Sequence, residues 1–399
     1  MDCYKDAAHV AGFTRPHAPV ICAREHAADK AARFFASRFP GETYYAVKAN
    51  PAPWLLRALY GAGVTRFEAA SIAEIHLVRG LFPDADIAFM HPVKAPEVIA
   101  EAYTEHGVRA FALDGADELE KVRVATNDAS DLTLCLRLAV PNDHAALSLG
   151  AKFGAAPDEA PALLAAMRPL ARRLGVTFHV GSQTHAPAAW LTAMDRAERA
   201  IVAAGVIVDV LDVGGGFPAP YPGMPEPTLD DIFRAIDARF ETMLVAENCA
   251  LWCEPGRALC AEAASLIVRV EARKGDRLYV NDGVYGALFD AGHLRWPFPA
   301  RRVAGGASHA HGTTAYSLYG PTCDDIDFMP GPFMLPADVA VGDYLEIGML
   351  GAYGSAMATR FNGFGGDYDV ARVADAPMLS AYGRNSDAGV AAGRAVRAL

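Results

Sequence analysis

The chain has little cysteine, no long apolar run and no excess of positive charge, and each absence excludes a class of protein. Seven cysteines are scattered over 399 residues, an odd count without the spacing of a disulfide framework. No apolar run reaches the roughly 18 residues that span a bilayer, and the opening MDCYKDAAHV has no signal-peptide core. The net charge of -11 argues against a nucleic-acid-binding face. We therefore expect a cytoplasmic protein with neither a membrane nor a nucleic acid as partner.

Sets of metal ligands at recognisable spacing are also scarce. Cys249 and Cys253 have no second pair at zinc-site spacing, so buried thiols are the simpler interpretation. The tract HAHG at 309–312 has no further ligands nearby, and we interpret it as a loop. We expect no metal site.

What the chain does have is a repeated alternation of short apolar segments and alanine-rich helical stretches between about 25 and 260. The expected strands are 43–49, 65–70, 86–91, 108–114, 132–140, 176–182, 207–215 and 250–255. The expected helices are 24–38, 53–62, 71–80, 94–106, 115–127, 157–174, 187–204 and 228–247. Eight strands that alternate with helices favour a closed TIM-like (β/α)8 barrel, with an open doubly wound sheet as the alternative.

The sequence pattern changes near residue 261. From there, alternating apolar and polar residues separated by Gly/Pro turns predict a β-rich second domain, a β-sandwich or β-barrel. The first 20 or so residues show no helical period, and PVICA, 19–23, is expected to add a strand to the second domain. We therefore expect a barrel domain, 25–260, and a β-rich domain made of 1–24 together with 261–399.

Polar residues gather where the expected barrel strands end, which is where TIM-barrel function lies. They are Lys48 in YYAVKANP, Glu68, Arg137, His179 and Ser182 in HVGSQ, Gly214, Gly215 and Gly216 in DVGGGFP, and Glu254, Gly256 and Arg257 in CEPGR. Taken singly, each is most simply a solvated charge, a tight turn or a hydrogen-bonded side chain. Together they offer a phosphate site, an anion, a flat ring and an amine that a low-dielectric site would deprotonate. This set suits pyridoxal 5'-phosphate (PLP).

Six motifs in order, YYAVKANP, HVGSQ, DVGGGFP, EPGRAL, YGPTCDDID and GAYGSAMATRFNGF, span about 44–364. The set resembles the fold-type III PLP-dependent decarboxylases, which share the architecture of alanine racemase and act on ornithine, lysine, diaminopimelate or carboxynorspermidine. The resemblance implies that Lys48 holds PLP as a Schiff base, that His179 stacks on the ring and that Glu254 meets the pyridine nitrogen. It implies a phosphate cradle of Ser182, Gly214, Gly215, Gly216, Gly256, Arg257 and Tyr353. Glu68, where the family commonly has Asp, and Arg137 would support this site.

The resemblance also implies a homodimer with shared active sites. Cys323 and Asp324 would enter the neighbouring subunit's site, with Cys323 reprotonating the α-carbon after CO2 leaves. Phe361 and Tyr285 would belong to the substrate pocket.

The far end of the substrate decides which decarboxylase this is. Asp324 after Cys323 favours a basic amino acid, ornithine or lysine, and a diamine for polyamine synthesis, because an ammonium group binds carboxylates. Asp290 is the nearest candidate for a second carboxylate. An arginine such as Arg295 facing the substrate would instead favour diaminopimelate or carboxynorspermidine.

Two other functions remain as alternatives. In an amino-acid racemase, the segment TCDD at 322–325 would have no role. A non-catalytic homologue would be expected to have lost Lys48, Arg257 or Cys323.

Overall fold

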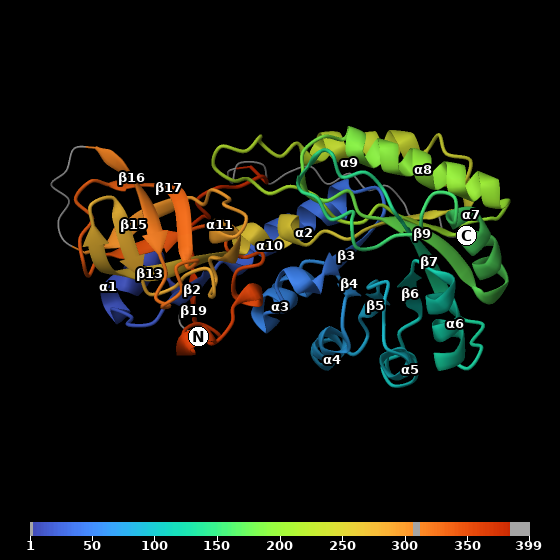
Figure 1. Cartoon of the computed structure of the whole chain (residues 1–399), viewed down its shortest axis with the longest axis horizontal. Coiled ribbons are helices and arrows are strands. Elements are labelled where there is room, and N and C mark those ends of the chain that lie inside the picture. Colours follow the sequence, from blue (N-terminus) through green and yellow to red (C-terminus); the bar gives the residue numbers. More distant parts are fainter. Residues whose placement is uncertain (1–2, 306–311, 384–399) are drawn as a thin grey trace.

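The computed structural model describes residues 3–305 and 312–383. Two units lie side by side along its long axis, a barrel surrounded by helices and a mixed β-sheet (Figure 1). Residues 309–311 of the HAHG tract, expected to form a loop, lie outside the described residues. Among the described helices, none combines the length and the apolar character that crossing a bilayer requires.

The first unit is a closed barrel of parallel strands, as the alternating pattern predicted. Its strands are β3 (Glu42–Ala46), β4 (Arg66–Ala69), β5 (Asp86–Phe89), β6 (Ala110–Leu113), β7 (Thr133–Leu138), β9 (Arg173–Phe178), β11 (Val210–Asp212) and β12 (Ala250–Cys253). Around it lie α2 (Glu25–Arg38), α3 (Pro53–Gly61), α4 (Ile72–Leu81), α5 (Pro96–Thr104), α6 (Ala116–Ala125), α7 (Ala160–Met167), α8 (Ala188–Ala204) and α9 (Leu229–Phe240). Pairing of β12 with β3 closes the ring, so the open-sheet alternative is wrong.

The interior of the barrel is filled by a few large side chains set against very small ones. Tyr44 and Trp252 pack with ring centroids 4.6 Å apart. Elsewhere in the ring, a Cβ at Gly175 of β9 would lie 2.5 Å from Cys135 Sγ and 3.2 Å from Val210 Cβ. Glycine is therefore required at 175 by packing, and the barrel is a solid core rather than a pore.

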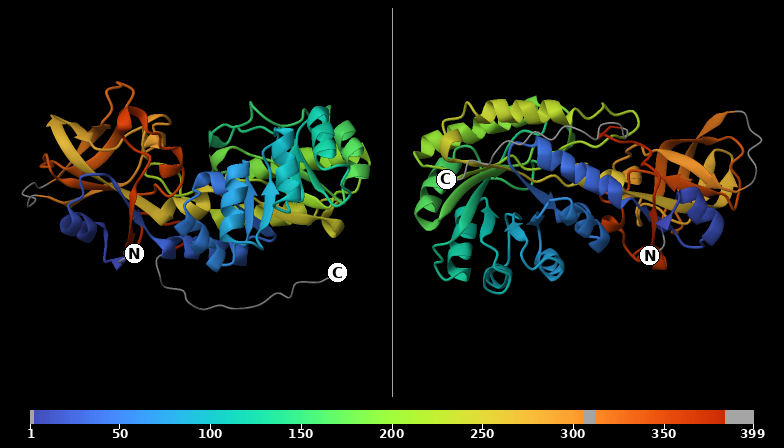
Figure 2. Two further views of the ribbon diagram at one scale, coloured as in Figure 1. Left: turned by 90° about the horizontal axis from the view of Figure 1, so that it is seen from below. Right: turned by 180° about the vertical axis from the view of Figure 1, so that it is seen from behind.

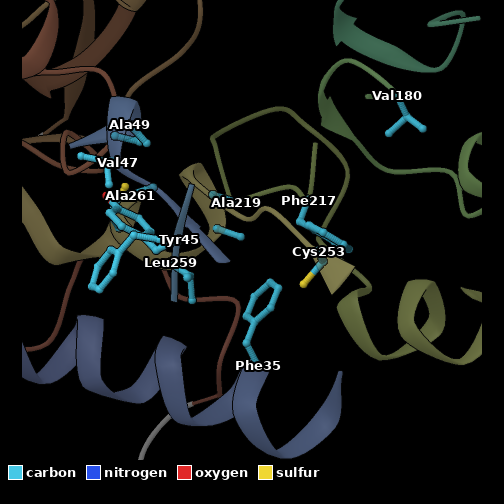
Figure 3. Packing of buried hydrophobic residues seen from close by; sticks show 14 of the residues in the cluster. Phe35, Tyr45, Val47, Ala49, Val180, Phe217, Ala219, Cys253, Leu259 and Ala261 are labelled. Atoms are coloured by element: carbon cyan, nitrogen blue, oxygen red, sulfur yellow. The ribbon is translucent and has the colours of Figure 1, made fainter. Parts of the chain in front are cut away.

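An aromatic layer joins the barrel to its outer helices. Phe35 of α2 lies 5.5 Å from Phe217 and 5.0 Å from Phe233 of α9 in edge-on contacts, and Trp190 of α8 stacks on Phe217. Figure 3 shows Phe35 directed from its helix toward Phe217 and Cys253. Because strands in such a fold are covered on both sides, they are apolar throughout rather than alternating.

The second unit is a mixed sheet built from both ends of the chain (Figure 2). Its strands are β1 (Cys3–Tyr4), β2 (Val20–Ala23), β13 (Ala264–Lys274), β14 (Arg277–Val280), β15 (Ala300–Ala304), β16 (Thr313–Tyr319), β17 (Phe328–Pro336), β18 (Tyr344–Ile347) and β19 (Asp369–Val373). The predicted strand in PVICA is confirmed, because β2 pairs antiparallel with β13 and parallel with β19.

Two details of the expected secondary structure are wrong. The first 20 residues contain a helix, α1 (Ala7–Thr14), whose first turn is capped by the Asp6 side chain accepting from His9 N at 2.8 Å. The helix expected over 157–174 ends at Met167, and β9 already begins at Arg173. Pro169 explains the early end, because proline removes a backbone donor that a continuing helix would need.

Candidate active site

A cavity of about 420 Å³ opens at the carboxyl ends of the barrel strands. Of the residues proposed from the sequence, those in its wall are Lys48, Glu68, Arg137, His179, Ser182, Gly216, Glu254, Gly256, Arg257 and Tyr353. Tyr353 comes from the second unit, and its N–H donates to Ala49 O at 2.8 Å. The strand ends that were expected to converge therefore share one cavity.

Lys48 lies in a 3-10 turn, Val47–Ala49, directly after β3. Its Nζ is 3.1 Å from Oε2 of the buried Glu68, while 41% of the Lys48 side chain is open to the cavity. Burial alone would lower the pKa of Lys48, but the facing Glu68 carboxylate, with Tyr353 and Glu254 beyond it, raises that pKa above its ordinary value. The direction of this shift favours the ammonium form of Lys48, contrary to the expectation that the site deprotonates the amine.

Glu254 follows β12 and presents a buried carboxyl to the cavity. Its Oε1 is buried without a hydrogen-bond partner. Burial and the neighbouring Asp212 carboxylate raise the pKa of Glu254 well above its usual value. Asp212 is itself fixed by Thr177 Oγ1 and by Gly214 N, each donating at 2.9 Å. An unpaired buried acceptor in a cavity wall is suited to a donor on a ligand, such as a ring N–H.

His179 contributes an uncharged ring. Its Nδ1 accepts from Gly181 N at 3.1 Å. Burial, followed by the charges of Arg137 and Lys48, lowers the pKa of His179 well below its ordinary value. A neutral, flat imidazole in the cavity wall suits stacking on an aromatic ligand.

The glycine loop is wedged between two strand ends. Gly214 and Gly216 have φ of +65° and +98°, and added Cβ atoms would lie 1.9 Å from Phe178 O and 2.4 Å from Gly181 O, respectively. Glycine is therefore required at both positions. The N–H of Gly214 donates to Asp212, so Gly214 shapes the loop, and of the three glycines Gly216 lines the cavity.

Arg257 and Asp290, which the sequence analysis assigned to opposite ends of a ligand, are paired. Arg257 begins the short helix α10 (Arg257–Cys260), and it donates to Tyr221 Oη at 2.9 Å and to Asp290 Oδ2 at 3.0 Å. Its Nε is buried without a partner, which leaves a donor for an anion. The Asp290 carboxylate is thus engaged by Arg257 and does not line the cavity.

The remaining predicted residues form a group on the second unit, which we call the thiol cluster: exposed Cys323 and Phe361 with half-buried Asp324 and Tyr285. Tyr285 Oη donates to Asp324 Oδ2 at 2.6 Å and its ring lies 4.5 Å from that of Phe361. Cys323 is exposed, and its N and Sγ lie 3.1 and 3.3 Å from Asn362 Oδ1. None of these four residues lines the cavity, so one chain holds two separate parts of the predicted site.

Sequence reasoning missed three residues that hold these parts in place. Asp212 and Asn362 lie inside motifs already singled out, DVGGGFP and FNGF, so their position was the available signal. Asp327 is buried and accepts from Val284 N and from the N–H and hydroxyl of Thr322. It thereby joins the segment that carries Tyr285 to the one that carries Cys323.

Comparison with known proteins agrees with this geometry. The family model for the pyridoxal-binding domain of pyridoxal-dependent decarboxylases matches residues 24–261. The lysine/ornithine decarboxylase of Selenomonas ruminantium is 33% identical over 330 residues, covering 80% of this chain and 81% of the relative.

Solved structures show the same likeness. The lysine/ornithine decarboxylase of Vibrio vulnificus complexed with putrescine has a TM-score of 0.78 at 28% identity, covering 93% of this chain and 99% of that chain. The arginine decarboxylase of Paramecium bursaria Chlorella virus bound to agmatine has a TM-score of 0.80 at 26% identity, covering 91% and 98%.

The closed barrel, with a lysine and a buried carboxyl in one cavity at its strand ends, is the architecture of a PLP-dependent enzyme. The chain belongs to the pyridoxal-dependent decarboxylases. Its cofactor is PLP, and its reaction class is the decarboxylation of an amino acid rather than racemisation.

Proposed function

We propose that the chain removes CO2 from a basic L-amino acid, ornithine or lysine, and releases a diamine for polyamine synthesis. The observation that carries the reaction is the unpaired buried oxygen of Glu254 in one cavity with Lys48 and His179. The substrate class is supported by the Selenomonas relative's name and by putrescine in the Vibrio structure.

Each group in the cavity takes one role in this proposal. Bound PLP supplies an electron sink for the electron pair that CO2 leaves behind. Lys48 would hold the cofactor covalently, Glu254 would accept from its ring nitrogen and His179 would stack on its ring. The phosphate is assigned to Ser182, Gly215, Gly216, Gly256, Arg257 and Tyr353, with Gly214 shaping the loop.

Two supporting residues act on Lys48 and on the cavity charge. Glu68 accepts a hydrogen bond from Lys48 Nζ, so it would position the lysine amine and hold its proton. Arg137 lies with its guanidinium 5.4 Å from the centre of the Phe153 ring, at the cavity wall. Its charge, after burial, keeps His179 neutral.

The site is completed by a second copy of the chain in a homodimer. The cavity has no thiol in its wall, whereas Cys323 is exposed beside Asp324 on the second unit. Cys323 of one copy would deliver the proton to the α-carbon in the cavity of the other, because thiols exchange protons near neutral pH. Phe361 and Tyr285 would enter with it and form part of the substrate pocket.

Asp324 selects a distal ammonium group. The hydrogen bond from Tyr285 and the N–H of Ile326 hold the pKa of Asp324 below its ordinary value, so the residue stays a carboxylate. Because the Asp290 carboxylate is hydrogen-bonded to Arg257, the ammonium group of the substrate would contact one carboxylate, that of Asp324, rather than two. Arg295 does not line the cavity of its own chain.

The organisation of the chain follows the same proposal. We assign 25–260 to the cofactor-binding barrel and 1–24 with 261–399 to the domain that carries the thiol cluster. All seven cysteines are free thiols, which supports a reducing compartment, the cytoplasm.

The experiment is CO2 release by the PLP-loaded protein from L-ornithine, L-lysine, L-arginine, meso-diaminopimelate and carboxynorspermidine, with Lys48→Ala alongside. Turnover of ornithine or lysine that is lost in Lys48→Ala is the expected result. Turnover of diaminopimelate or carboxynorspermidine alone would contradict the role of Asp324. Ornithine and lysine differ by one methylene, worth about 1–3 kcal/mol of discrimination, so activity on both is expected.

A further inference from the structure

A second group of potential ligands lies on the flank of the barrel, away from the cavity. It consists of His76 in α4, Glu101 in α5 and His106 in the turn after α5, and we call it the brace cluster. Its ligand atoms all lie within 4.8 Å of one another. Because His106 precedes β6, the cluster lies toward the amino ends of the strands, whereas the cavity is at their carboxyl ends. Figure 1 shows α4 and α5 next to each other at this edge.

The distances in the brace cluster leave room for an ion. Glu101 Oε1 is 2.5 Å from His76 Nε2 and 3.6 Å from His106 Nε2, and the two imidazole centroids are 4.7 Å apart. Two ligands that each bind zinc at about 2.1 Å in a tetrahedron are about 3.4 Å apart. The two printed separations from Glu101 Oε1 lie on either side of this value, and all three ligand atoms lie within 4.8 Å of one another.

Hydrogen bonding inside the cluster leaves one nitrogen unsatisfied. His106 Nε2 is buried without a hydrogen-bond partner, although its side chain packs beside Glu101. A buried imidazole nitrogen that faces a carboxylate oxygen, with a second imidazole bound to that same oxygen, is the arrangement that a cation would complete.

The backbone that carries His106 is held in place. Arg79, one turn after His76 in α4, donates to His106 O at 2.8 Å and to Ala85 O at 2.9 Å, and its guanidinium also reaches Pro83 O. These carbonyl oxygens engage the positive charge of Arg79 away from the ligand atoms. The arginine thus fixes the turn after α5 against α4, a supporting contact typical of metal sites.

We propose that His76, Glu101 and His106 bind a divalent transition-metal ion, Zn²⁺ in chemical preference, which braces α4 against the turn after α5. Two imidazoles and one carboxylate form a donor set that zinc accepts, with water at the fourth position. The half-exposed His76 side chain leaves that position open to solvent. Sequence spacing did not indicate this site because its ligands are separated by 25 and 5 residues on different elements.

The test is Zn²⁺ titration of the metal-stripped holoenzyme by calorimetry, together with Tm measured with and without Zn²⁺. The wild type is expected to bind one ion and to gain roughly 2–4 °C in Tm. Glu101→Gln and His106→Ala are expected to weaken binding at least tenfold and to abolish the shift. His9→Ala, which removes an exposed histidine of α1, is expected to behave as the wild type.

Exposed thiols are the competing ligands, because Cys3 and Cys323 are also accessible to zinc. Co²⁺ in place of Zn²⁺ distinguishes them, since thiolate ligation adds an intense near-ultraviolet charge-transfer band that imidazole and carboxylate ligation lacks. Visible bands without it, lost in Glu101→Gln, support the brace cluster. Equal zinc affinity in the wild type and both cluster variants, or a thiolate band that persists in them, would overturn the proposal.

Discussion

Charges of single residues set the protonation states of the groups that line the cavity. Lys48 faces the Glu68 carboxylate, whose charge outweighs burial and raises the pKa of Lys48 above its ordinary value. Glu254 in turn holds its proton because it is buried beside Asp212. The sequence correctly indicated which of these residues share a rim. It did not indicate their protonation, which depends on distances such as the 3.1 Å between Lys48 and Glu68.

Removing the Glu68 charge is expected to make Lys48 react with PLP at lower pH. Imine formation needs the neutral amine, and Glu68→Gln removes the charge that raises the pKa of Lys48. The pH profile of the rate at which the metal-free apoprotein captures PLP should therefore move to lower pH. Glu42→Gln, at the start of β3 and outside the cavity wall, should leave the profile unchanged. Superimposed profiles for Glu68→Gln and the wild type would contradict this account.

Cys323→Ala is expected to lower turnover by about 10²–10⁴-fold, the contribution of a positioned acid. The cofactor absorbance should not change, because the residues assigned to hold the cofactor are unaltered in this variant. Cys3→Ala, which removes another exposed thiol, is the matched control. Turnover within a factor of two or three of the wild type in Cys323→Ala would exclude the proposed proton donor.

At the scale of elements, the eight strands and the helices between them follow from the sequence, because each strand is an apolar run closed by a turn. The shortest helices and strands could not be predicted from the sequence. The helix α1 has only 8 residues, too few for a clear period, and β19 becomes recognisable only through its pairing with β2. Likewise, no local pattern predicts that Asp290 pairs with Arg257 across 33 positions.

The glycine loop after β11 provides a prediction at this scale. The control is Gly205→Ala at the end of α8, a residue with φ of +64° and open space around its position. This substitution is expected to lower the free energy of unfolding by about 1–2 kcal/mol, through backbone strain alone. Gly216→Ala adds a clash with Gly181 O to the same strain. It should therefore reduce the free energy of unfolding further and also weaken PLP binding. Equal losses for the two variants in denaturant unfolding would contradict the proposed packing.

At the scale of the whole molecule, the two units are joined by buried polar contacts. Buried Asn50, just after Lys48, donates from Nδ2 to Gly351 O at 2.8 Å, and Arg257 of α10 pairs with Asp290 at 3.0 Å. Where the barrel ends and the second unit begins, Glu262 accepts from Ala381 N and so fixes the described end of the chain at this junction. The sequence indicated two units, but long-range ion pairs between them have no local signal.

Glu262 makes the stability of this junction depend on pH. Burial raises the pKa of the Glu262 carboxyl from 4.5 to about 7. The folded protein then binds one more proton than the unfolded chain between these values, so stability falls as pH rises through this window, by about 3 kcal/mol in all. Glu262→Gln should lose this part of the pH dependence, and the exposed Glu247→Gln should retain it. Unfolding by denaturant at pH 5 and pH 8 measures the difference.

The central claim is that two copies of the chain build each active site, and mixing two inactive variants tests it most directly. Lys48→Ala and Cys323→Ala proteins are mixed under conditions of subunit exchange, which labelled subunits verify, and CO2 release from ornithine and lysine is measured. A mixed dimer has one intact site, so equal mixing should restore activity to about a quarter of the wild type. Exchange without recovered activity would contradict the shared site.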